Sequence, residues 1–138
     1  MTLDQVRKIN WLNRAIHAEK AAKSWLAKCE RDRSLAERLS RGGGTGGSSA
    51  GNATEDALVR LAETEAETQE KLRRLVDTRE EITQVIRQLP DGDMQAILVR
   101  HFLAYETFDT IAERMHYSRP TVMRKYKAAI EMILNDTP

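Results

Sequence analysis

The sequence predicts an all-α protein, with a long antiparallel helical hairpin followed by a three-helix head. Charged residues make up 31% of the 138 residues and aromatic residues only 5%, a composition that favours helices over a β-sandwich. Two long segments, 3–40 and 54–89, contain neither glycine nor proline. After Pro90 the helical pattern changes to short units.

The N-terminal helix is predicted over residues 1–41. Thr2 is a candidate N-cap, with Gln5 at the spacing of a capping box, and Gly42 is a natural stop. We expect Cys29 to be a small buried or half-buried filler. A broad apolar stripe follows Val6, Ile9, Leu12, Ile16, Trp25 and Leu26.

A flexible Gly/Ser linker is predicted over residues 42–53, because six of the seven glycines lie in this stretch. It lacks the Gly-Lys-Ser/Thr ending of a phosphate-binding loop, and no β-strand pattern precedes it.

The second long helix is predicted over residues 54–89, capped by Thr54 and ended by Pro90. A heptad seam over this helix predicts packing against the first one. Because a two-helix hairpin cannot enclose all of this surface, we expect its outer flank to pack on another subunit, most simply in a dimer, or on the C-terminal part of the chain. The predicted seam consists of Leu58, Leu61, Glu65, Thr68, Leu72, Leu75, Arg79, Ile82, Ile86 and Leu89.

Residues 90–138 are predicted to form the head. Asp91 and Asp93, Thr107 and Ser118 stand where three short helices begin. Pro120 fits the first turn of the third helix, where a missing N–H costs nothing. Between them, His116-Tyr117 forms a tight turn. The predicted core includes Ile111, Ala112, Met115, Tyr117 and Val122.

The last two short helices have the pattern of a helix-turn-helix, which reads DNA through its second helix. Four basic residues and no acidic one lie between Ser118 and Lys127. Arg119 and Thr121 are expected to contact bases first, with Arg124 next. Ser118, Lys125 and Lys127 are expected to hold phosphates.

Residues 89–133 resemble the C-terminal DNA-binding region of sigma-70-type factors, through the segments Thr-Phe-Asp-Thr-Ile-Ala-Glu-Arg-Met and Ser-Arg-Pro-Thr-Val-Met-Arg-Lys-Tyr-Lys. With a long charged helix pair ahead of this region, the chain is similar to ArpU-like and RinA-like transcriptional regulators of phages and prophages. The resemblance implies sequence-specific binding of double-stranded DNA, and it leaves a contact with bacterial RNA polymerase open. His116 departs from the glycine usual at this turn of the family.

Two other functions remain open: a DNA-packaging subunit like a small terminase, and an adaptor that binds polymerase. The excess of basic residues in 1–41, including Arg31, Arg33, Arg38 and Arg41, is more typical of a solvated helix surface than of a DNA contact.

Enzymatic activity is not expected, because no nucleophile and base stand at a suitable spacing. The three histidines have no metal-ligand partners, so neither a metal nor a cofactor is expected. A single cysteine and the absence of a long apolar run or a signal core predict a cytoplasmic protein, not associated with membranes. The resemblance to phage regulators implies that the cell is a bacterial host.

Overall fold

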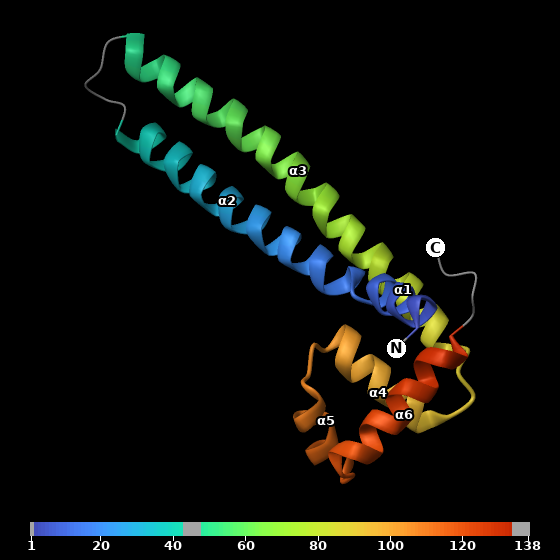
Figure 1. Cartoon of the computed structure of the whole chain (residues 1–138). Helices are drawn as coiled ribbons and strands as arrows, with labels where there is room; N and C mark the ends of the chain where they lie inside the picture. The colour runs from blue at the N-terminus through green and yellow to red at the C-terminus, as the bar shows by residue number, and fades with distance from the viewer. Residues whose placement is uncertain (1, 43–47, 134–138) are drawn as a thin grey trace. The chain divides into compact units, whose positions relative to one another are not determined.

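The computed structural model describes residues 2–42 and 48–133, and within these ranges all regular structure is helical. The predicted all-α class is confirmed. The elements, shown in Figure 1, are α1 (Leu3–Leu12), α2 (Arg14–Gly42), α3 (Ser48–Arg87), α4 (Gly92–Leu98), the π-helical turn η2 (Val99–Leu103), α5 (Phe108–Met115) and α6 (Arg119–Met132).

The long helices differ in their bounds from the prediction. The capping box of Thr2 and Gln5 is present, but the first helix is divided at Asn13. Asn competes for backbone hydrogen bonds and therefore favours helix ends. Of the predicted linker, Gly42 belongs to α2 and residues 48–53 belong to α3, which begins six residues before Thr54. Residues 43–47 lie outside the described residues.

The chain forms two compact units. One comprises Met1–His17 and Val76–Pro138, and we call it unit 1; the other, Ala18–Leu75, is unit 2. Unit 1 therefore extends beyond the predicted head, 90–138, by α1, the start of α2 and the end of α3.

Unit 2 is an antiparallel pair made of α2 and α3, whose segments lie side by side (Figure 1). Thr68 Oγ1 lies 3.2 Å from the carbonyl oxygen of Trp25, and Lys28 Nζ donates to Thr64 Oγ1 over 3.2 Å. The residue that comes later on α2 thus meets the earlier one on α3, as an antiparallel arrangement requires.

Small side chains recur every seven residues along the seam between these helices. On α2 they are Ala22, Cys29 and Ala36, each no more than 5% exposed. On α3 the buried residues Ala57 and Thr64 have the same spacing. A heptad keeps one face toward the partner helix, and small side chains allow the two backbones to approach closely. The expectation that Cys29 is a small buried filler is confirmed.

The seam departs from the register that the sequence predicted at two positions near the start of α3. Leu58 is 50% exposed and Glu65 is exposed, whereas their neighbours Ala57 and Thr64 are buried. At these two of the ten predicted positions the register was therefore wrong by one residue. A closely packed seam favours a small side chain, so Ala57 is buried and the larger Leu58 is not. The predicted positions that are buried as expected are Thr68, Ile82, Ile86 and Leu89.

The core of unit 1 joins the head, which consists of α4, η2, α5 and α6, to the ends of the long helices. Fully buried aliphatic side chains come from both parts, including Leu12 from α1 and Ile82 and Ile86 from the end of α3. From the head come Ile97, Leu98, Ile111, Val122 and Ile130. Burying such a side chain contributes about 1.5–3 kcal/mol, so this shared core holds the head to α1 and α3.

Arg79 of α3 fixes the end of the π-helical turn. Its Nη1 donates to the carbonyl oxygen of Leu103 over 2.9 Å and to Tyr105 Oη over 3.1 Å. Carbonyl groups at a helix end lack intrahelical partners, and a guanidinium satisfies them. The predicted seam position Arg79 therefore serves unit 1 as a hydrogen-bond donor.

Candidate nucleic-acid interface

The turn between α5 and α6 has the geometry of a helix-turn-helix. Helix α5 begins at Thr107, whose side chain accepts a hydrogen bond from the N–H of Thr110 over 3.2 Å. It ends at His116, which adopts a left-handed backbone with φ of 60°. Ser118 then caps α6 by accepting from the N–H of Thr121 over 3.3 Å. The predicted caps and turn are confirmed, and histidine occupies the left-handed position that favours glycine.

The inner face of α6 anchors the helix through an aromatic cluster. Tyr126 lies between Phe102 and Phe108, at centroid distances of 6.1 Å and 4.8 Å. His101 stacks on Phe108 at 4.3 Å, and its Nδ1 lies 3.0 Å from the carbonyl oxygen of Glu106. Burial raises the pKa of the Tyr126 hydroxyl, because the charged form would lose its hydration.

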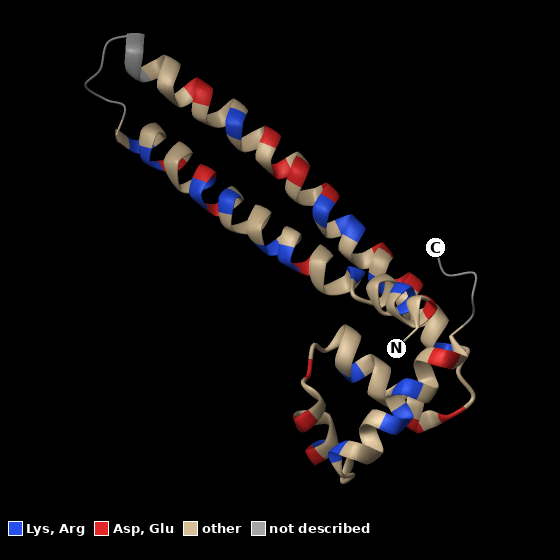
Figure 2. Cartoon of the chain, viewed as in Figure 1, with Lys and Arg blue, Asp and Glu red and all other residues tan. Residues whose placement is uncertain are grey.

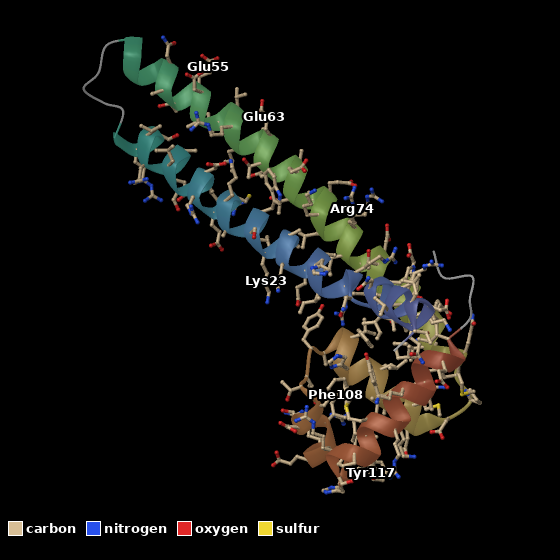
Figure 3. The ribbon with its side chains drawn as sticks, viewed as in Figure 1. Lys23, Glu55, Glu63, Arg74, Phe108 and Tyr117 are labelled. Carbon is tan, nitrogen blue, oxygen red and sulfur yellow. The ribbon has the colours of Figure 1, made fainter. Side chains whose placement is uncertain are left out.

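Tyr117 does not enter the core, contrary to the prediction. It is 37% exposed and lies at the turn before α6, whereas Phe108 lies inside the head (Figure 3). Its hydroxyl donates to Asp93 Oδ2 over 2.6 Å. This hydrogen bond, and then the nearby Lys125, hold the pKa of the Asp93 carboxyl below its usual range. The hydroxyl group of Tyr117 thus links the turn to α4. Met115, another predicted core residue, is half-buried and packs against the core.

Two of the predicted basic site residues have acidic partners. Arg119 Nη1 lies 3.2 Å from Asp109 Oδ1, and Lys125 Nζ lies 3.4 Å from Asp93 Oδ2. Both partners of the Arg119 pair are well exposed, so the pair contributes little stability. The acidic groups on α5 beside the basic groups on α6 are visible in Figure 2.

Arg124 and Lys127 form the free basic part of α6. Both are exposed, and among the described residues neither has an acidic oxygen within 4.0 Å. The spacing of Pro120, Arg124 and Lys127 places them on one face of the helix, away from the buried residues Val122 and Tyr126.

The hydroxyl groups at the start of α6 belong to the same surface. Thr121 Oγ1 accepts from Arg124 Nη2 over 3.2 Å and lies 2.9 Å from Ser118 Oγ. Thr121 therefore contacts both Ser118 and Arg124, whereas Lys127 lies one turn further along the helix.

Helix α1 supports the other end of α6, a relationship that the sequence did not indicate. Gln5 Nε2 donates to Glu131 Oε1 over 3.1 Å, and Lys8 Nζ donates to the carbonyl oxygen of Glu131 over 3.3 Å. Lys8 also pairs with Asp4 at 3.3 Å. These residues are 123 or more positions away from Glu131 along the chain, so no local pattern could have found the contacts.

The histidines and the cysteine do not gather into a metal centre. Over residues 2–42 and 48–133, no group of three or more His, Cys, Asp or Glu side chains is placed to hold an ion. His101 belongs to the aromatic cluster and His116 to the turn.

In the same ranges, no helix combines the length and the apolar character that a membrane crossing requires.

The chain matches a protein family, although no curated protein and no solved structure matches it. Residues 40–135 match a protein family, and this stretch includes α3 and the whole head. The match covers more than half of the 138 residues. The chain therefore belongs to the family described as "Protein of unknown function (DUF1492)".

Proposed function

We propose that this protein is a sequence-specific DNA-binding transcriptional regulator of the phage or prophage type, with α6 as the helix that reads the major groove. The observation that carries the proposal is the free basic face of α6, at Arg124 and Lys127, directly after a capped turn. The resemblance of this region to the DNA-binding region of sigma-70-type factors supports the same function.

The start of α6 suits a phosphate or a base edge. The first N–H groups of a helix are only partly satisfied, and the helix dipole makes this end positive. Ser118 and Thr121 add hydroxyl groups, and Arg124 can offer a bidentate donor pair to guanine. Lys127, one turn later, is suited to a phosphate.

The acidic partners refine the roles of the remaining residues. Lys125 is held between Asp93 and the ring of Tyr117, whose centroid is 5.4 Å from Nζ. We assign Lys125 to a phosphate contact at the edge of the interface. Arg119 must exchange Asp109 for DNA before it can contact a base, so it follows Arg124 in importance.

Selection of bound fragments from a random pool of duplex DNA tests the proposed function. Enrichment of one short motif is expected, with its loss in a folded Arg124→Ala variant. A pool that stays random would contradict sequence-specific binding. A single, high molar mass in light scattering, as expected for a ring of many copies, would instead favour the packaging function.

A further inference from the structure

Unit 2 carries a second basic surface, on the side of α2 that faces away from α3. Lys20 lies two residues before Ala22, Arg31 two after Cys29, and Arg38 two after Ala36. Two residues correspond to a rotation of about 200° around a helix, so these three cations lie opposite the buried seam. Lys23 and Arg41 border the same side, and we call these five residues the basic face of α2.

The cations of the basic face are available to a ligand. All five are exposed, and among the described residues none has an acidic oxygen within 4.0 Å. Other cations of α2 are engaged: Lys28 pairs with Asp32 at 2.9 Å, and Arg33 with Glu65 at 3.5 Å.

The acidic residues of α2 leave the middle of this face clear. Glu19, Glu30 and Glu37 directly precede Lys20, Arg31 and Arg38, and successive residues are about 100° apart around a helix. The acidic residues therefore form a separate line along one flank. Between the cations lie the small, exposed side chains of Ser24, Ala27 and Ser34, and the half-buried Leu35 lies beside Arg31 and Arg38.

We propose that the basic face of α2 binds the sugar–phosphate backbone of duplex DNA without reading its sequence. From Lys20 to Arg41 the helix extends about 31 Å at 1.5 Å per residue, close to the roughly 34 Å of one turn of duplex. Arginine recognises phosphate through two parallel donors. The inference rests on the proposed function in one respect, that DNA is the ligand, and it adds a contact remote from α6 in the sequence.

The chemistry of this face favours DNA over a membrane surface. A helix that lies on a bilayer needs large apolar side chains beside its cations, to insert among the lipids. On α2, Ala22, Cys29 and Ala36 face the seam, and the exposed Leu26 lies about 120–140° around the helix from Lys20, Arg31 and Arg38. The basic face therefore presents cations with mainly small side chains between them, and such a surface matches a polyanion.

The salt dependence of binding to a random-sequence duplex tests the proposal on the full chain. The test variant carries Lys20→Gln, Arg31→Gln and Arg38→Gln. A matched control carries Arg60→Gln, Arg73→Gln and Arg74→Gln on α3, which removes the same charge from the same unit. The slope of log K against log salt is negative, and each lost phosphate contact reduces its magnitude by about 0.9. We expect the test variant to lose about two to three units of slope and the control less than about one unit.

A crosslinking measurement locates the contact independently of net charge. In a Cys29→Ala background, a photoreactive group is attached to Ser34→Cys on the basic face or to Gln69→Cys at an exposed position on α3. The group at residue 34 should crosslink to duplex DNA, and the group at residue 69 should not. Circular dichroism of every variant verifies that the helices are retained.

Several outcomes would overturn the proposal. These are an unchanged slope in the test variant, an equal loss in test and control, or crosslinking that does not favour residue 34. Loss of binding to anionic vesicles without any change on DNA would assign the face to lipid. If these α2 variants behave as wild type while Arg124→Ala with Lys127→Ala loses DNA binding, the proposed function stands and only this inference fails. A wild type that binds no duplex at all would contradict both.

Discussion

Lys8 Nζ lies 3.3 Å from the carbonyl oxygen of Glu131, so that a buried cation from α1 meets the C-terminal end of α6. The last carbonyl groups of a helix lack intrahelical partners, and this end carries the negative pole of the helix dipole. Lys8 is only 3% exposed and is balanced by Asp4. Lys8, a residue of α1, thus holds α6, the candidate DNA-reading helix, in place.

Replacement of Lys8 by methionine should destabilise unit 1. Lys8→Met keeps most of the aliphatic volume and removes the charge, so the carbonyl oxygen of Glu131 loses its donor. We expect a decrease in the free energy of unfolding of about 1–3 kcal/mol, measured by chemical denaturation. Lys23→Met, at an exposed position of α2, is the control and should change it by less than about 0.5 kcal/mol. A Lys8→Met protein as stable as wild type would show that the contact contributes nothing.

The seam between α2 and α3 should reject larger side chains. Cys29→Leu adds volume where small residues recur every seven positions, and we expect it to destabilise the protein by about 1–3 kcal/mol. Ala27→Leu adds a larger side chain on the exposed side of the same helix and should change stability by less than about 0.5 kcal/mol. Thermal unfolding followed by circular dichroism compares them. Equal melting temperatures for the two variants would be incompatible with the register described for the seam.

The short-range features of this fold could be predicted from the sequence. Thr2, Thr107 and Ser118 cap the helices they were expected to cap, because a capping side chain bonds to N–H groups only two or three residues away. The tight turn at His116-Tyr117 was likewise expected, and the left-handed backbone of His116 is a property of that turn itself. In these places local chemistry decides the structure.

Features that depend on distant contacts could not be predicted. The seam register depends on how closely two backbones approach, and the hydrophobicity of Leu58 pointed to the wrong face. The position of Tyr117 is decided by Asp93, 24 residues earlier in the chain. The candidate site stays a prediction from residue types, whereas the pairing of Arg119 and Lys125 with carboxylates, on which we base our proposal that Arg124 contacts a base first, required the structure.

The Asp93 carboxyl should report the contact between α4 and the turn. Its pKa is lowered chiefly by the hydrogen bond from Tyr117, so Tyr117→Phe should raise that pKa toward its ordinary value of 3.8. The pKa of Asp93 is lower in the folded than in the unfolded protein, so ionised Asp93 stabilises the fold at a pH above its unfolded-state pKa. This stabilisation is lost as the pH falls through the folded-state pKa. An NMR titration of the Asp93 carboxyl carbon measures the shift, with Asp32 in unit 2 as an unaffected reference. The same Asp93 pKa in both proteins would exclude this hydrogen bond in solution.

Self-association stays a prediction. The structure shows which apolar residues of α3 can be substituted to test it without disrupting the core. Ile82 is fully buried in unit 1, so its substitution would disrupt the core. Leu58 and Val59, by contrast, are 50% and 55% exposed. We expect a dimer at micromolar concentration for wild type and a lower mass for Leu58→Glu with Val59→Glu, measured by light scattering. A wild type that stays monomeric at high concentration would refute the prediction.

The role of α6 in reading DNA is tested most directly by titrating folded variants against a selected duplex at several salt concentrations. Arg124→Ala should cost about 1–3 kcal/mol of binding free energy and relax the preference at one base pair. Lys127→Ala should weaken all sequences alike and reduce the salt slope by about one unit. Unchanged affinity, base preference and salt dependence in both variants would contradict the account, because the basic side of α6 would then be only a solvated surface.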